Sequence, residues 1–233
     1  MHIKLQDVSV NYSGKKVLKG ITTTFETGNI VMIIGRNGSG KSTLLKVLAG
    51  LIDFAGQIII PEKYSDISEL TGYVFQNPET QIVGSTVFED VIFGLENIGF
   101  SKTEMETRAR YVLDLLELSD LKFFDPYYLS GGQKQRLAIA SVLALNPEFL
   151  LLDEVTAMLD KNGKREVLNA VLKLKETNKG VIVATHELNL FLPYVDRCIY
   201  IEDGKIAFDG NPHDGAELYR KAATEKFKKI QVQ

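Results

Sequence analysis

A short stretch near residue 40 carries the residue types that bind phosphate. From Gly35 to Ser42 the sequence reads GRNGSGKS. Glycine lets a backbone approach an anion closely, and the freed N–H groups can all point at it. Lys41 adds a full positive charge for the terminal phosphates of a nucleotide, and Ser42 adds a hydroxyl for Mg²⁺. The stretch therefore predicts a phosphate-binding loop built on three glycines, Gly35, Gly38 and Gly40.

Two carboxylates stand at the end of an apolar run further along the chain. Asp153 and Glu154 directly follow residues 149–152, and His186 and Gln76 also stand at the ends of apolar runs. Carboxylates in such a place are costly to bury unless they meet a cation. Asp153 is a candidate to hold Mg²⁺ through its water shell, and Glu154 to orient or deprotonate a water. Ligands bind beyond the carboxyl ends of parallel strands, which favours a shared site for the four residues.

The surrounding elements must hold these groups together. Residues 30–34 form a continuous apolar run, as a strand buried on both faces requires, and an apolar helix face follows the glycine-rich turn. Strands alternate with helices along the chain, which predicts a parallel sheet with helices on both faces. Residues 3–12 and 16–26 read as two strands of an antiparallel region. The predicted fold class is α/β.

A helical insert interrupts the alternation. From Thr86 to Phe124 apolar residues recur at helical spacing, and Ser101 and Glu104 fit a capping box. A further helix, apolar nearly all round, begins after Ser130–Gly132. An N-cap serine before two glycines offers a second anion-binding helix start, although by themselves these three residues are more typical of an ordinary capped helix.

Composition excludes several classes of protein. The chain has 233 residues, of which 45% are hydrophobic and 24% charged, as in ordinary soluble proteins. A net charge of −3 and a pI of about 5.7 disfavour a general nucleic-acid binder. Cys198 is the single cysteine, so no internal disulfide can form. The sequence has neither a run of ~18 apolar residues nor a signal-peptide pattern. We therefore expect a cytosolic protein that reaches a membrane only through a partner.

In this order the pieces resemble the ATP-binding cassette (ABC) family across nearly the whole chain. The matching motifs are Walker A at Gly35–Thr43, the Q-loop at Gln76, the LSGGQ signature at Leu129–Gln133, the end of Walker B at Asp153-Glu154, the D-loop at Thr156–Asp160 and the switch histidine at His186. Six motifs in register are far more specific than any one of them. The resemblance implies a P-loop NTPase (RecA-like) core in a single ABC ATPase domain, residues 1–233. Its nucleotide-binding core would comprise residues 1–83 and 149–233, and its helical subdomain residues 84–148.

The resemblance also implies roles for further residues, with ATP and Mg²⁺ as cofactors. Tyr12 takes the place of an aromatic residue that stacks on adenine, although the residues alone favour a tyrosine that merely packs at a strand end. The implied catalytic residues are Lys41, Glu154 and His186. The implied nucleotide-binding residues are Tyr12, Gly35, Asn37, Gly38, Ser39, Gly40, Lys41, Ser42 and Thr43. The implied metal-site residues are Ser42, Gln76 and Asp153.

The family further implies a head-to-tail dimer in which each ATP lies between the Walker A motif of one chain and the signature of the other. Two helix starts and Lys41 would then surround a polyanion that neither half neutralises alone. Val155, just before the D-loop, and Met158, within it, stand where the family usually has Pro and Gly, which favours a heterodimer of unlike ATPases over a homodimer. The residues expected to contact the partner's nucleotide are Ser130, Gly131, Gly132 and Gln133.

A narrower resemblance concerns the segment after the Q-loop. Residues 74–83 and 89–97 are similar to the ATPase subunits of energy-coupling-factor (ECF) transporters, importers of vitamins and of cobalt or nickel. In that family the segment lines a groove for coupling helices of the transmembrane subunit. Glu79 matches an acid that pairs with an arginine of that subunit, whereas alone it would be an ordinary surface acid. The implied partners are a second ATPase subunit, a transmembrane coupling subunit and a substrate-binding membrane protein, with no nucleic acid.

The leading interpretation is an ATPase subunit at the cytoplasmic face of the membrane that powers import of a vitamin or transition-metal ion. One alternative is a soluble ABC ATPase acting on ribosomes or DNA. The single cassette, the acidic pI and the lack of sustained heptads between Lys41 and Leu129 disfavour it. Another alternative is a weakly hydrolysing regulatory partner in a heterodimer. The intact Walker B end and His186 oppose it, while the D-loop departures keep it open.

Overall fold

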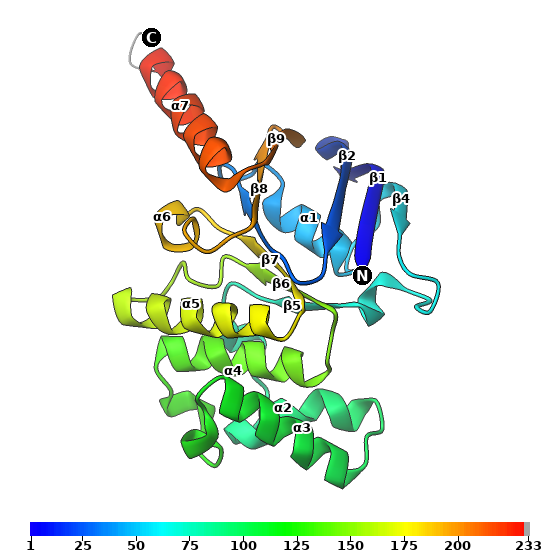
Figure 1. Ribbon diagram of the computed structural model, residues 1–233, viewed down its shortest axis with the longest axis vertical. Coiled ribbons are helices and arrows are strands. Elements are labelled where there is room, and N and C mark those ends of the chain that lie inside the picture. Colours follow the sequence, from blue (N-terminus) through cyan, green and yellow to red (C-terminus); the bar gives the residue numbers. More distant parts are fainter. Residues whose placement is uncertain (231–233) are drawn as a thin grey trace.

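Two sheets and the helices around them make up the chain, shown as a computed structural model in Figure 1. The structure describes residues 1–230, with side chains described through residue 224. The central sheet has six strands in the order β5-β6-β7-β3-β8-β9. Its strands are β5 (Thr71–Val74), β6 (Phe149–Asp153), β7 (Gly180–Ala184), β3 (Ile30–Ile34), β8 (Arg197–Glu202) and β9 (Lys205–Gly210). The first five run parallel, as predicted, and β9 forms an antiparallel edge on β8.

A second sheet confirms the predicted antiparallel region. It contains β1 (His2–Tyr12), β2 (Lys15–Glu26) and β4 (Ala55–Ile59), with β1 in the middle and paired antiparallel to both neighbours. The side chain of Arg197 on β8 bonds Asp209 on β9 and the carbonyl oxygen of Thr24 on β2. These bonds tie the second sheet to the edge of the central sheet.

Helices cover both faces of the central sheet, as predicted. The helices of the chain are α1 (Lys41–Leu48), α2 (Val87–Asn97), α3 (Lys102–Leu115), α4 (Gly131–Ala144), α5 (Lys161–Glu176), α6 (Leu188–Phe191) and α7 (Pro212–Ile230). Among them, α2 and α3 pack against α4. Short 3₁₀ turns are η1 (Ile67–Glu69), η2 (Pro78–Thr80), η3 (Ser119–Leu121) and η4 (Pro126–Tyr128). Across the described part of the chain, no helix combines the length and the apolar character needed to span a membrane.

The continuous apolar run in β3 serves two cores. Successive side chains of a strand point to opposite faces. Ile30, Met32 and Ile34 belong to a core shared with α4 and α5, whereas Val31 and Ile33 belong to a core shared with α1 and the second sheet. A strand covered on both faces has no solvent-facing position, and this is why its sequence shows no polar alternation.

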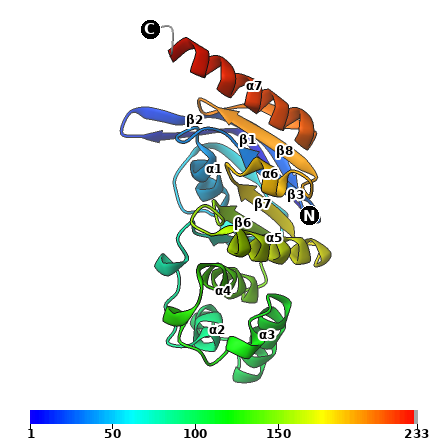
Figure 2. The same ribbon diagram turned by 90° about the vertical axis from the view of Figure 1, so that its left-hand side faces the viewer.

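The helical insert lies at one end of the molecule, and α7 lies at the other (Figures 1 and 2). The predicted capping box opens α3: Ser101 N donates to Glu104 Oε2 at 3.1 Å, and Glu104 N donates to Ser101 Oγ at 3.4 Å. The apolar faces of α2, α3 and α4 join the same core as one face of the central sheet. The division into residues 84–148 and the remainder stays a prediction.

Candidate functional site

The glycine-rich turn leads from the end of β3 into α1. Gly40 is the N-cap of α1 and has φ +112°, a left-handed conformation that favours glycine. A Cβ atom on Gly40 would lie 2.7 Å from Leu18 Cδ2, and one on Gly35 would lie 2.4 Å from the carbonyl oxygen of Ile201. Both positions therefore require glycine, and the turn wraps closely over the start of the helix.

Lys41 is the cation at this turn. It is only 5% exposed, and its Nζ donates to the carbonyl oxygens of Gly35 at 3.1 Å and Arg36 at 3.4 Å. Nζ also lies 3.5 Å from Glu154 Oε1. A buried ammonium needs partners of this kind. They hold the charge at the N-terminus of α1, where the helix dipole already favours an anion.

Asp153 ends β6 beside the same helix start. Ser42 Oγ donates to Asp153 Oδ1 at 2.8 Å, and the hydroxyl of Tyr73 on β5 donates to Asp153 Oδ2 at 2.6 Å. Burial, together with the hydrogen bond to Asp153, raises the pKa of Tyr73, so its hydroxyl remains a donor at neutral pH. One hydroxyl and one carboxylate form the kind of oxygen donor set that Mg²⁺ uses when substrate phosphates supply the other ligands. These residues therefore fit a magnesium–nucleotide complex.

Glu154 follows Asp153 and stands between two other predicted residues. Its Oε1 lies 3.5 Å from Lys41 Nζ, and its Oε2 lies 3.5 Å from His186 Nδ1. Its backbone has φ +49°, and its N–H donates to the carbonyl oxygen of Ala184 on β7 at 2.9 Å. A left-handed backbone costs a non-glycine residue about 1–2 kcal/mol. The sharp turn that it makes brings the carboxylate back over the phosphate-binding loop.

An open cavity of about 330 Å³ joins several of the predicted residues. It is lined by Val17, Asn37, Gly38, Gly40, Lys41, Ser42, Thr43, Gln76 and Glu154. Gln76, which follows β5, thus faces the same space as the phosphate-binding loop. Ser39 is buried, and its Oγ has no hydrogen-bond partner among the described residues. An unsatisfied hydroxyl in this turn fits a ligand that accepts a hydrogen bond.

Tyr12 does not line this cavity. It ends β1, where it pairs with Lys15, and it is 45% exposed. Val17, five residues later on β2, does line the cavity. The hairpin therefore borders the nucleotide site, while the contact of the tyrosine with adenine stays a prediction.

The signature residues lie at a different place on the surface. Ser130 caps α4 with a reciprocal pair of bonds: Gln133 N donates to Ser130 Oγ at 3.2 Å, and Ser130 N donates to Gln133 Oε1 at 2.8 Å. Ser130, Gly131 and Gly132 line a second cavity of about 350 Å³ with residues 158–160 of the D-loop. None of the residues that line the first cavity lines this one. The N-termini of α1 and α4 thus face separate cavities. Val155, just before the D-loop, is buried, and Met158, within it, is exposed.

Glu79, the predicted partner-binding acid, has a partner within the chain. Its Oε1 accepts from Lys134 Nζ at 2.7 Å, and this hydrogen bond lowers the pKa of the Glu79 carboxyl. Lys134 belongs to the first turn of α4, immediately after the signature. The ring of Tyr127 lies 5.8 Å from the same ammonium. The Glu79 side chain remains 65% exposed, so a second cation can reach it.

Sequence reasoning did not find the residues that fasten the Q-loop to α4. Asp90, only 4% exposed, accepts from Val83 N at 2.7 Å, Gly84 N at 2.9 Å and Ser141 Oγ at 2.6 Å. Gln135 Nε2 donates to the carbonyl oxygen of Phe75 at 3.2 Å. A signal for Asp90 did exist, because it lies on the apolar face of α2 between Val87 and Val91. A carboxylate in such a position must be satisfied from other elements.

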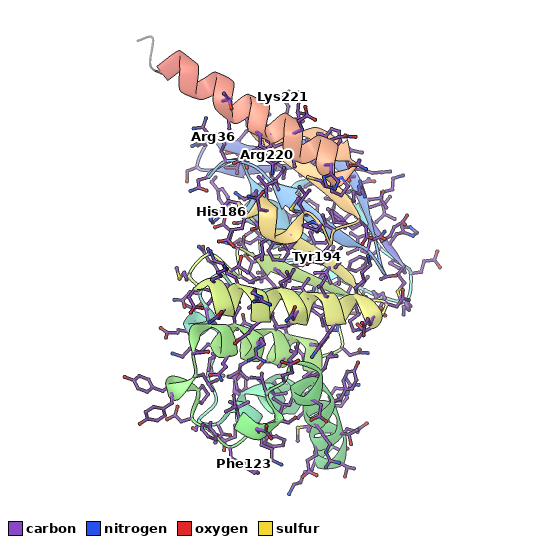
Figure 3. The ribbon with its side chains drawn as sticks, turned by 60° about the vertical axis from the view of Figure 1, so that its left-hand side comes forward. Arg36, Phe123, His186, Tyr194, Arg220 and Lys221 are labelled. Carbon is purple, nitrogen blue, oxygen red and sulfur yellow. The ribbon has the colours of Figure 1, made fainter. Side chains whose placement is uncertain are left out.

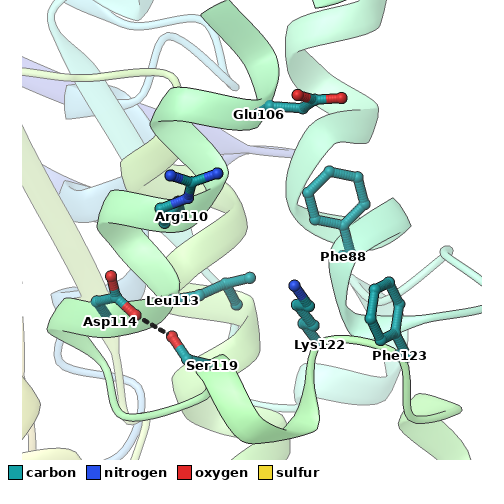
Figure 4. Close-up of a pocket in the computed structure, with 8 residues that line it drawn as sticks. All are labelled: Phe88, Glu106, Arg110, Leu113, Asp114, Ser119, Lys122 and Phe123. Carbon is teal, nitrogen blue, oxygen red and sulfur yellow. Dashed lines mark hydrogen bonds between the residues drawn. The ribbon is translucent and has the colours of Figure 1, made fainter. Parts of the chain in front are cut away.

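The helical insert has a groove of its own, about 500 Å³ in volume (Figure 4). It is lined by Phe88, Glu106, Arg110, Leu113, Asp114, Ser119, Lys122 and Phe123. Phe123 is 74% exposed and lies far from His186 and Arg36 in Figure 3. The groove therefore belongs to a different surface from the phosphate-binding loop, one that combines the exposed ring of Phe123 and the half-buried ring of Phe88 with charges of both signs.

Comparison with known proteins agrees with this geometry. Residues 18–157 match the family model described as ABC transporter. The chain is 48% identical over 214 residues to the energy-coupling factor transporter ATP-binding protein EcfA1 of Thermotoga maritima, covering 91% of this chain and 82% of that protein.

Solved structures give the same result. The chain resembles cbiO1 from Clostridium perfringens, described as part of the ABC transporter complex cbiONQ, with a TM-score of 0.84, 32% identity and coverage of 99% of this chain and 94% of that one. It also resembles MJ0796, described as a dimeric bacterial ABC transporter cassette, with a TM-score of 0.76, 32% identity and coverage of 90% and 98%. The chain therefore belongs to the ABC transporter family, as an ATP-binding ATPase of the cassette type.

Proposed function

We propose that this chain is the ATP-hydrolysing subunit of an ECF-type importer that takes up a vitamin or a transition-metal ion. The observation that carries the proposal is the gathering of Lys41, Ser42, Asp153, Glu154 and His186 around the phosphate-binding loop, with the signature on a separate surface. The names of the relatives support the transporter class, since EcfA1 is an energy-coupling factor protein and cbiO1 is part of a transporter complex.

We infer a step in hydrolysis for each of these residues, and their geometry supports it. ATP binds with its β- and γ-phosphates at Lys41 and the start of α1. Mg²⁺, held by Ser42 and Gln76 and through water by Asp153, would offset the phosphate charge. Glu154 orients and deprotonates the attacking water, since its carboxylate stands beside both Lys41 and His186. His186 then donates a hydrogen bond to the γ-phosphate.

A second cassette completes the site. The signature helix start, with Ser130 at its N-cap, binds the γ-phosphate held by the partner chain, because a helix N-terminus attracts a polyanion. Val155, just before the D-loop, and Met158, within it, depart from the usual Pro and Gly and favour an unlike ATPase as that partner. Hydrolysis separates the two chains, and the cycle of closing and opening drives the transmembrane subunit.

The membrane partner docks on the helical insert and the Q-loop. Glu79 offers a carboxylate to an arginine of the transmembrane subunit, and the groove of Figure 4 offers apolar rings to its coupling helix. The chain would thus be a peripheral protein at the cytoplasmic face of the membrane. A separate substrate-binding membrane protein would recognise the cargo.

Co-purification from membranes of the source cell tests the importer proposal. The tagged chain should recover a transmembrane subunit, a small substrate-binding membrane protein and a second ATPase. Glu79→Arg should reduce recovery of the membrane proteins at least fivefold, because it places like charges against the partner's arginine. Glu62→Arg is the matched control: Glu62 is also an exposed acid, in the turn between β4 and η1.

A third variant distinguishes the effect of Glu79 on the membrane partner from the effect of its ion pair with Lys134. Lys134→Met frees Glu79 without changing its charge, so recovery should stay at the wild-type level or rise. Recovery of ribosomes or DNA-bound proteins instead would favour the soluble alternative. Equal losses in Glu79→Arg and Glu62→Arg would remove Glu79 from the docking surface.

A further inference from the structure

Both oxygens of the Asp153 carboxylate are hydrogen-bonded, and only one donor belongs to a known motif. Ser42 Oγ, from the phosphate-binding loop, donates to Oδ1 at 2.8 Å. The phenol of Tyr73 donates to Oδ2 at 2.6 Å. Tyr73 stands three residues before Gln76, on the neighbouring strand, and does not line the nucleotide cavity. Tyr73 therefore contacts the Asp153 carboxylate from outside the nucleotide cavity.

The sheet itself aims the phenol at this carboxylate. Tyr73 on β5 pairs in parallel register with Leu151 on β6. Side chains two residues apart on a strand share a face, so Asp153 projects on the same side as Leu151 and one step further along. The ring of Tyr73 also packs edge-to-face on Phe75, with centroids 5.0 Å apart and an interplanar angle of 77°. Strand register and ring packing together leave the hydroxyl little freedom.

We propose that Tyr73 is a positioning residue for the magnesium site, which locks the Asp153 carboxylate so that Oδ1 faces Ser42 and the metal. A carboxylate held at one oxygen only can rotate about its Cβ–Cγ bond, and metal binding must then stop that rotation. Partners behind a metal-facing group commonly change metal affinity 10–100-fold when removed. This inference rests on the proposed function, since it takes Asp153 as the residue that faces Mg²⁺.

The test is Tyr73→Phe, which removes one oxygen atom and keeps the ring against Phe75. We would titrate a fluorescent non-hydrolysable ATP analogue in EDTA and then titrate Mg²⁺ at a fixed analogue concentration. Affinity for the analogue in EDTA should stay within about twofold of wild type. The Mg²⁺ concentration at half-maximal effect should rise about 10-fold. In ATPase assays at low Mg²⁺, Tyr73→Phe should hydrolyse ATP more slowly than wild type, and this difference should disappear at saturating Mg²⁺. A variant that is only less stable would not show this dependence on Mg²⁺.

Tyr64→Phe is the matched control. Tyr64 OH donates to Glu148 Oε1 at 2.9 Å, and Glu148 directly precedes β6, so the same kind of bond is lost at the opposite end of the same strand. Thermal melting of both variants compares their folding. Equal Mg²⁺ dependence in Tyr73→Phe and wild type would overturn this inference and leave the proposed function standing. Absence of any Mg²⁺-dependent nucleotide binding by the wild-type chain would instead overturn the proposed function.

Discussion

At the scale of single residues, the site depends on one carboxylate held between two basic groups. Glu154 reaches Lys41 on one side and His186 on the other, both at 3.5 Å, from a backbone in the left-handed region. Strain of this kind persists only where the surrounding structure over-determines it. The bond from Glu154 N to the carbonyl oxygen of Ala184 supplies that constraint from the neighbouring strand.

The first prediction concerns the charge of this carboxylate. Glu154→Gln should reduce kcat for ATP hydrolysis at least 100-fold, because a neutral amide cannot accept a proton from water. ATP affinity should be retained within about twofold, since Lys41 keeps its carbonyl partners. Phosphate release and equilibrium nucleotide binding measure the two quantities. Glu148→Gln, at the other end of β6, should leave kcat unchanged. Wild-type turnover in Glu154→Gln would remove Glu154 as the base.

At the scale of elements, the start of the signature helix packs against the start of α5. A Cβ atom on Gly132 would lie 2.9 Å from Gly163 Cα and 2.7 Å from Glu166 Oε2. Arg136, one turn further along α4, holds Glu166 at 3.3 Å and also donates to the carbonyl oxygen of Leu116 at 2.8 Å. The glycine is therefore needed for packing within the chain as well as for any nucleotide.

This packing predicts unequal effects of adding a methyl group at two adjacent glycines. Gly132→Ala should lower the free energy of unfolding by about 1–3 kcal/mol, because the backbone of Gly163 cannot easily move away. Gly131→Ala should be nearly neutral, since its Cβ would meet only the tip of Leu159 at 3.1 Å and alanine is the better helix former. Urea unfolding of both variants gives the comparison. Equal free energies of unfolding for the two variants would show that α4 and α5 can move apart at Gly132 without loss of stability.

The same elements show which features can be predicted from the sequence and which cannot. Its local patterns correctly predicted β3, the glycine-rich turn, the capping box at Ser101 and the N-cap at Ser130, because these depend on residues a few positions apart. They did not reveal that Lys134 pairs with Glu79, 55 positions earlier, or that Ser141 bonds Asp90. Such pairs arise only when packing brings distant segments together, and no spacing rule encodes them. Tyr73 was missed for the same reason, since a phenol within a strand gives no sign of its partner on the next strand.

At the scale of the whole molecule, the phosphate-binding loop and the signature helix start lie on separate surfaces, and we propose that they are two halves of one kind of site. The cavity at Lys41 and the cavity at Ser130 have no lining residue in common. Each half presents a helix N-terminus, and a triphosphate has more charge than one such terminus offsets. In the proposed head-to-tail dimer a second cassette supplies the missing half, so nucleotide binding by one chain and association of two chains would be separable steps.

The last prediction uses this separation. Ser130→Arg places a bulky cation at the signature helix start, so it should abolish ATP-dependent association with the second cassette, seen by size-exclusion chromatography. The isolated monomer should still bind ATP with an affinity within about twofold of wild type, because the phosphate-binding loop is untouched. Ser101→Arg is a close control: Ser101 also caps a helix through a capping box, on α3. It should leave both association and binding intact. Weaker ATP binding by monomeric Ser130→Arg alone would mean that the signature acts on its own chain's nucleotide, which would overturn the head-to-tail arrangement.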